Sequence, residues 1–95
     1  MSAYIFVSVE IHDPVRYEGY RKSVLPTIEK YAGRFIVRGG KMEVLEGHWP
    51  QRRIVIVEFP SAEIAREWWN SPEYAAPKAL RQATSHSDMI LVEGV

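Results

Sequence analysis

The sequence contains no cysteine, which excludes disulfide bonds, thiolate metal sites and cysteine nucleophiles. Its charges also balance, because twelve Lys and Arg residues are matched by twelve Asp and Glu residues. A protein that binds nucleic acid needs a clustered basic surface, so this composition argues against a nucleic-acid partner. The histidines His12, His48 and His86 lack local metal-ligand spacing, and we therefore expect no metal site.

Long hydrophobic runs are absent as well. The apolar stretch near the N-terminus is far too short to span a bilayer, and it lacks the basic segment and cleavage site of a secretory signal. We therefore expect a cytoplasmic protein without a membrane partner. The length of 95 residues suits a single domain covering residues 1–95.

Hydrophobic patterning predicts β-structure in four places. β-Branched and aromatic residues are concentrated at 4–11, 53–59 and 89–93, and the stretch 33–47 also has strand character around a central Arg-Gly-Gly. We expect a turn at 47–52 and a loop at 84–88.

Capping residues predict the helices. Asp13-Pro14 and Ser71-Pro72 each combine an N-cap with proline at the first helical position, and Ser61 is a third cap. Pro26 should kink or divide the first helix, and Gly33 should end it. The order is β-α-β-β-α-β, with the second helical segment in two pieces. This is an α+β, ferredoxin-like sandwich with a four-stranded antiparallel sheet and helices on one face.

The second face of this sheet would then lack a cover. A solvated face should carry polar residues at alternate positions, but 54–57 and 90–92 are continuously apolar, and Tyr4 and Phe6 oppose Ile5 and Val7. Apolar patches of this size rarely stay exposed on a monomer. We therefore predict a homodimer that packs sheet against sheet with two-fold symmetry. The alternative is that the C-terminal segment or a loop covers the patch.

Arg38 is the first candidate for a functional residue. If 47–52 is the turn, antiparallel partners sum to 99. One or two extra residues at Gly39-Gly40 would then bring Arg38 level with Phe59 or Pro60, diagonal to Glu58, which is the one acid of its strand. The structural interpretation is an Arg38–Glu58 ion pair. The functional interpretation is that Arg38 binds a carboxylate or another anion while Glu58 orients it. Gly39-Gly40 is either a hairpin turn or a bulge in one long strand.

An aromatic group on the predicted helices is the second candidate. Tyr20, Trp68, Trp69 and Tyr74 are explained either as core residues or as the walls of a small-molecule pocket. His48, next to Trp49, is a weaker candidate for a pocket acid or base. Glu10 and Arg81 are further charges that could reach a site, although solvated positions explain them equally well.

The chain resembles the uncharacterised family called domain of unknown function 1330, of the dimeric α+β barrel superfamily. The resemblance covers nearly the whole chain and rests on several ordered motifs: Asp13-Pro14 with Tyr17 and Tyr20, 33–40, 44–47, Trp49-Pro50, 57–61, Trp68, 71–74, Leu80-Arg81 and 91–94. At one position, occupied here by His48, we would expect an aspartate.

The resemblance implies a ferredoxin-like protomer that dimerises through its sheet, and no established reaction. The superfamily includes cofactor-independent monooxygenases of aromatic substrates, heme-binding or heme-degrading proteins, and stress-responsive proteins. No histidine here is persuasive as an axial ligand, so we expect no cofactor.

Three hypotheses follow. The first is a small-molecule binder with Arg38 and Glu58 as polar anchors and Tyr20, Trp68 and Tyr74 as walls. The second is a cofactor-independent monooxygenase in which Arg38 or His48 stabilises a substrate anion. The third is a non-catalytic structural or interaction protein.

Overall fold

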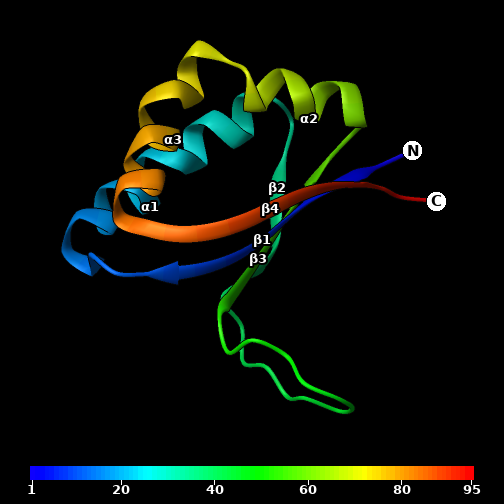
Figure 1. Cartoon of the computed structure of the whole chain (residues 1–95). Coiled ribbons are helices and arrows are strands. Elements are labelled where there is room, and N and C mark those ends of the chain that lie inside the picture. The colour runs from blue at the N-terminus through cyan, green and yellow to red at the C-terminus, as the bar shows by residue number, and fades with distance from the viewer.

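The computed structural model describes residues 1–95 as a four-stranded antiparallel sheet with helices on one face (Figure 1). The strands lie in the order β2-β3-β1-β4, so the predicted ferredoxin-like fold is confirmed. None of the helices combines the length and apolar character needed to cross a membrane. In chain order the elements are β1 (Ala3–Ile11), α1 (Pro14–Lys30), β2 (Arg34–Arg38), β3 (Arg53–Phe59), α2 (Ala62–Trp69), α3 (Pro72–Thr84) and β4 (Ser85–Glu93).

The predicted N-caps form as expected. The side chains of Asp13, Ser61 and Ser71 each accept a hydrogen bond of 3.2 Å from the backbone N–H three residues later. These bonds satisfy donors that a helix start leaves free. Pro26 does not divide α1, which continues to Lys30. Burial of Thr27 and Ile28 in the turn that follows offsets the backbone hydrogen bond that proline removes.

The end of α1 differs from the prediction in its mechanism. Ala32, at φ 58°, is the residue in the left-handed conformation, although Gly33 was expected to end the helix. Gly33 is instead required for space. A Cβ atom there would lie 2.6 Å from the Phe59 ring and 2.8 Å from Ile28, and a contact under 3 Å forces one side to move.

Two predicted boundaries are wrong. β2 ends at Arg38, and residues 39–52 leave the sheet as an extended arm with no strand, so neither the β-structure to residue 47 nor the register built on it exists (Figure 1). Gly39, at φ 69°, starts this departure. The predicted loop at 84–88 is absent too, because α3 runs to Thr84 and β4 begins at Ser85. The backbone of β4 pairs with β1 along its whole length, ending with Ser85 opposite Ile11. This pairing holds residues 85–88 in a strand although their polar side chains favour a loop.

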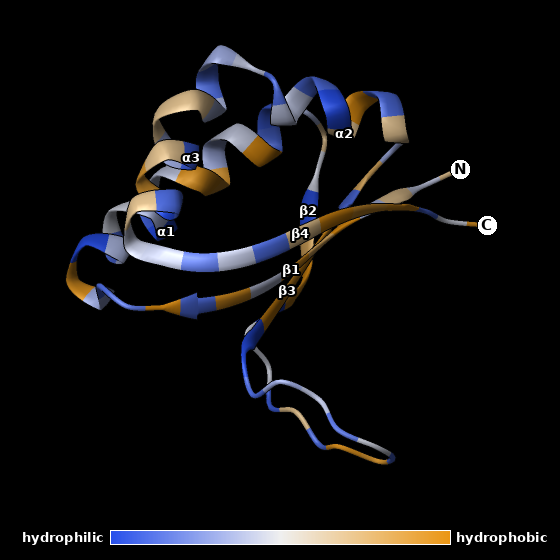
Figure 2. Cartoon of the chain, viewed as in Figure 1, coloured by the Kyte–Doolittle hydropathy of each residue, from blue (hydrophilic) through white to orange (hydrophobic).

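The sheet presents two different faces. The inner face packs on the helices, where Phe59, Trp68 and Tyr74 are 0–1% exposed. The outer face is also apolar, since Phe6 lies between Ile56 on one neighbouring strand and Ile90 on the other. No helix covers it, and Ile90 is 56% exposed (Figures 1 and 2). The arm adds exposed apolar residues of its own: Val44, Leu45 and Trp49.

Candidate functional site

A β-bulge brings Arg38 to the inner face of the sheet. Phe35 pairs with Val57, but after a one-residue shift at Ile36 the partner of Arg38 is Val55. Side chains of a regular strand alternate between faces, so without the shift Arg38 would point away from the helices. The bulge turns the guanidinium toward α1, where Nη2 donates a hydrogen bond of 3.4 Å to the carbonyl oxygen of Arg21.

The predicted ion pair between Arg38 and Glu58 is wrong. Glu58 alternates with buried core residues of β3 and therefore lies on the outer face. Its partners there are Arg34, whose Nε donates to Oε1 at 2.7 Å, and Tyr4, whose hydroxyl donates to Oε2 at 3.3 Å. The hydrogen bond from Arg34 is the largest cause of the lowered pKa of Glu58. The error came from the assumed length of the strand before the turn.

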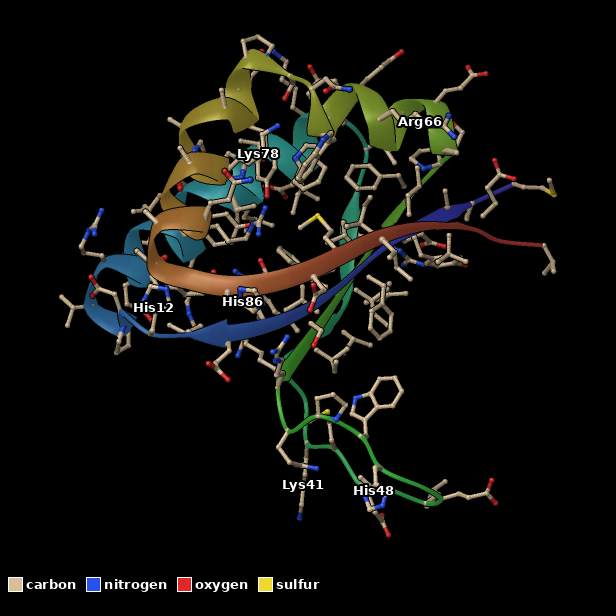
Figure 3. All side chains as sticks on the ribbon, viewed as in Figure 1. His12, Lys41, His48, Arg66, Lys78 and His86 are labelled. Carbon is tan, nitrogen blue, oxygen red and sulfur yellow. The ribbon has the colours of Figure 1, made fainter.

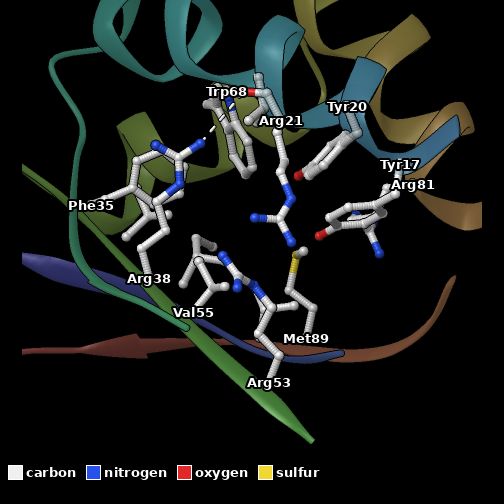
Figure 4. A pocket seen from close by; sticks show the side chains of 14 residues that line it. Tyr17, Tyr20, Arg21, Phe35, Arg38, Arg53, Val55, Trp68, Arg81 and Met89 are labelled. Atoms are coloured by element: carbon white, nitrogen blue, oxygen red, sulfur yellow. Dashed lines mark hydrogen bonds between the residues drawn. The ribbon is translucent and has the colours of Figure 1, made fainter. Parts of the chain in front are cut away.

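Four arginines instead share one cavity between the sheet and the helices. Arg21 reaches down from α1, Arg38 and Arg53 reach up from β2 and β3, and Arg81 comes from α3 (Figure 4). Ten of the 14 lining residues are hydrophobic, and none is an acid or a histidine. The cavity volume is about 30 Å³, roughly the space of one water molecule. The site is thus a small apolar cavity bordered by cations.

Arg81 is a buried cation without an acidic partner. Arg81 is only 4% exposed. Nε donates to the hydroxyl of Tyr74 at 3.3 Å, Nη1 donates to the hydroxyl of Ser87, and no ion pair involves this arginine. A guanidinium has five N–H donors, and buried charges are normally paired. Arg81 therefore has N–H groups beside the cavity that make no hydrogen bond within the chain.

Arg53 is also unpaired. Its Nε is buried and has no hydrogen-bond partner, and no carboxylate forms an ion pair with it. Burial lowers the pKa of Arg53, and the positive charges of Arg21 and Arg38 lower it further. Its guanidinium packs against Gly39, where a Cβ atom would lie 2.1 Å from Nη1. Gly39 thus makes room for Arg53 as well as turning the chain.

The other two arginines are held weakly. The Arg38 guanidinium stacks 4.1 Å from the ring centre of Phe35 and has no carboxylate partner. Arg21 Nε lies 3.2 Å from Glu18 Oε1, but its N–H is not aligned for a hydrogen bond with that oxygen. Glu18 is exposed and is the one acid that pairs with any of the four arginines.

Tyrosine hydroxyls complete the polar surface of the site. Tyr20 and Tyr74 share a hydrogen bond of 3.0 Å between their hydroxyl oxygens. The Tyr17 hydroxyl points into the cavity and makes no hydrogen bond within the chain, although Tyr17 is 4% exposed (Figure 4). Burial raises the pKa of both Tyr17 and Tyr20, so both are neutral phenols at pH 7. They can donate or accept a hydrogen bond but cannot act as phenolate bases.

The remaining predicted site residues are dispersed. Trp68 lines the cavity, but it is a core residue whose indole N–H donates to Thr27 at 3.0 Å. Tyr74 is fully buried behind the lining, where its ring stacks on Trp68 with centres 4.0 Å apart. His48 lies far out on the arm, remote from the cavity (Figure 3). Of the six predicted residues, Tyr20, Arg38 and Trp68 line the cavity.

Sequence reasoning did not single out Arg21 and Arg53, although the sequence carried a signal for both. Arg53 precedes Val55 and Val57 at two-residue spacing, which places it on the core-facing side of its strand. Arg21 follows Tyr17 by four positions and precedes Val24 by three, which places it on the apolar stripe of its helix. A charged residue at a position that continues the apolar side of a strand or helix is the pattern that would have predicted these two site residues.

A family model described as Domain of unknown function (DUF1330) matches residues 2–95. The chain belongs to this family. The recognition based on the sequence motifs is therefore confirmed. No protein of curated function matches the chain.

Solved structures share the fold at low sequence identity. A protein of unknown function from Rhodopseudomonas palustris is 20% identical with a TM-score of 0.80, and the match covers 99% of this chain and 82% of that one. A dimeric ferredoxin-like protein of unknown function from Jannaschia sp. CCS1 is 12% identical with a TM-score of 0.76, covering 99% and 100%. The cofactor-independent oxygenase SnoaB from Streptomyces nogalater is 11% identical with a TM-score of 0.65, covering 99% and 93%.

Proposed function

We propose that this DUF1330 protein binds a small molecule in the cavity between the sheet and the helices, with Arg38 among its polar anchors. One observation carries this proposal: four arginines border a largely apolar cavity, and one exposed acid is their sole ion-pair partner. Apolar walls with a few placed polar groups are typical of ligand sites. Glu58 is not part of the proposal, because it lies on the opposite face of the sheet.

A ligand needs more room than the cavity holds, since pockets for drug-sized molecules measure roughly 300–1,000 Å³. The arginines at the edge can supply that room. Arg38 is exposed, and its contacts here are a long hydrogen bond and a stack on Phe35, an interaction worth about 0.5–1 kcal/mol at exposed sites. Turning the Arg38 side chain outward therefore opens the cavity at small cost.

The proposal is tested with a panel of naphthalene derivatives that carry acidic, neutral or basic groups. We expect saturable binding of at least one member by calorimetry. A variant that fills the cavity, Val55→Phe, should abolish it, whereas Gln82→Phe on the exposed side of α3 should not. If no member binds, or if Val55→Phe binds as well as the original chain, the cavity is not a ligand site.

A second candidate function is cofactor-independent oxidation of an aromatic substrate. The shared fold with SnoaB and the cations around the cavity favour it, because such chemistry needs a group that stabilises a substrate anion. Oxygen uptake in the presence of a panel of hydroquinones tests this candidate. Uptake that is not above the buffer rate for any compound would rule it out for that class of substrate.

We also propose that two copies of the chain pack through their outer sheet faces. The exposed apolar residues on that face and the dimeric state of the Jannaschia protein support this. Native mass spectrometry should show a dimer. Ile90→Lys in the centre of the face should shift the mass to that of a monomer, and Gln82→Lys on α3 should not. A monomeric mass for the original chain would contradict this arrangement.

A further inference from the structure

We infer that the ligand of the cavity is a small organic carboxylate with an apolar body, an inference that rests on the small-molecule function proposed above. The carboxylate would lie among Tyr17, Arg21, Arg53 and Arg81, and the body would extend toward the mouth beside Phe35. Hydrogen-bond donors without partners, the absence of acids and the apolar walls of the cavity all point to such a ligand.

Several hydrogen-bond donors at the cavity have no partner within the chain. Buried polar groups are nearly always hydrogen-bonded, and each exception calls for an explanation. This cavity has two such exceptions, because the buried Nε atoms of Arg21 and Arg53 have no hydrogen-bond partner. Beside them, the Tyr17 hydroxyl makes no hydrogen bond within the chain, and Arg81 uses two of its N–H groups in hydrogen bonds. An oxyanion among these groups could accept hydrogen bonds from all of them.

The charge around the cavity is positive. Four of the twelve basic residues of a chain without net charge border this one cavity. No acid lines it, and Glu18 reaches Arg21 from the exposed side of α1. Like charges held together in a partly buried space repel one another, and they persist where a ligand of opposite charge relieves the repulsion. A cationic ligand is excluded by the same reasoning.

The narrow, apolar shape of the cavity favours an organic carboxylate over other anions. The cavity volume is about 30 Å³, and most of the walls are apolar. A planar carboxylate fits a narrow space between side chains, and arginine forks match it with two parallel hydrogen bonds. Phe35, Val55 and Met89 line the same cavity and offer apolar surface to the rest of the molecule. An inorganic anion would leave this surface unused.

The test compares 2-naphthoate with 2-naphthamide, which share a body and differ in charge. Calorimetry should show the acid binding at least tenfold more tightly than the amide. Tyr17→Phe, which removes one oxygen atom, and Arg53→Gln should each weaken acid binding roughly 10- to 100-fold, as expected for a hydrogen bond to a charged group. Neither change should alter amide binding by more than a few fold.

Controls separate a local effect from a general change in charge. Arg16→Gln removes the same charge from the exposed start of α1 and should leave both affinities unchanged. If Arg53→Gln fails to fold, Arg21→Gln, at another half-buried residue of the same proposed site, should weaken acid binding in its place. Acetate and inorganic phosphate at the same concentration should not displace the naphthoate, because they lack the apolar body.

The outcomes distinguish this inference from the function on which it rests. If the amide binds as tightly as the acid, the carboxylate inference is overturned and small-molecule binding stands. If phosphate alone displaces the naphthoate, the site is an inorganic-anion site and the inference is also overturned. If Arg16→Gln weakens acid binding as much as Arg53→Gln does, the effect of charge is not local and the carboxylate inference is overturned. If neither probe binds, and no other member of the naphthalene panel does, both proposals fail.

Discussion

Arg53 offers a prediction that reverses the usual effect of a mutation at a partly buried position. Arg53→Met should stabilise the unliganded protein. Its Nε is buried without a partner, and leaving such a donor unsatisfied costs about 1–3 kcal/mol. The residue is half-buried, so the lower part of this range applies. Methionine keeps an apolar stem of similar length, which limits the packing that is lost.

The expected gain in the free energy of unfolding is therefore about 1 kcal/mol, which corresponds to a rise in Tm of roughly 4–8 °C for a domain of this size. Urea and thermal unfolding at low salt and equal protein concentrations measure it. The gain should shrink at high salt, because salt screens the repulsion from Arg21 and Arg38.

The matched control is Arg34→Met, which makes the same substitution one strand away. Arg34 has a partner, since it donates to Glu58 at 2.7 Å. This variant should lose a little stability, as is typical of an exposed ion pair. If Arg53→Met unfolds at lower urea than the original chain, the unpaired guanidinium is not a source of instability, and the reasoning about the cavity is wrong.

Three further predictions concern other parts of the fold. Glu58→Gln should lower the urea midpoint at pH 7, and the difference in midpoint between this variant and the original chain should disappear toward pH 3. The pKa of Glu58 is lower in the folded state than in the unfolded state. The ionised carboxylate therefore stabilises the fold fully above the unfolded pKa of about 4.3, and this stabilisation is lost as the pH falls. Gly39→Ala should cost about 1–3 kcal/mol because of its positive φ and its crowded Cβ position, whereas Gly40→Ala, with open space, should be tolerated in the same unfolding assay. Thr27→Val should cost about 1–3 kcal/mol by leaving the Trp68 indole N–H unpaired, and an unchanged midpoint would contradict this.

The sequence predicted the parts of the fold that depend on local chemistry. Caps such as Asp13 and Ser71 act within one helical turn, so their spacing can be read directly. The order of elements and the uncovered outer face followed from alternation and its absence. Ala32 shows where prediction from local sequence fails. The neighbouring Gly33 was the better candidate for a left-handed backbone conformation, but Ala32 adopts it. Packing of Gly33 against Phe59 is a tertiary constraint that no local pattern displays.

The site was harder to predict, because it depends on how strands align. The prediction placed Arg38 in a site but gave it the wrong partner, since nothing in the sequence marks Ile36 as an extra residue. The predicted register between β2 and β3 was also wrong because residues 39–52 form an arm outside the sheet, whereas the prediction continued the strand to residue 47. Arg81 was noted as one charge among others, and its burial depends on the docking of α3 against α1 and the sheet. Alignment between segments distant in sequence was therefore the missing information.

The bulge in β2 also has an evolutionary consequence. The extra residue at position 36 lets Phe35 and Arg38, three positions apart in the sequence, lie on the same face of the sheet. Deletion of Ile36 would remove the bulge and leave a regular strand in which Arg38 still pairs with Val55 and faces the helices. A homologue whose β2 is one residue shorter can therefore present the same arginine to the cavity, and homologues should be compared by the strand partner of this arginine as well as by its position in the sequence.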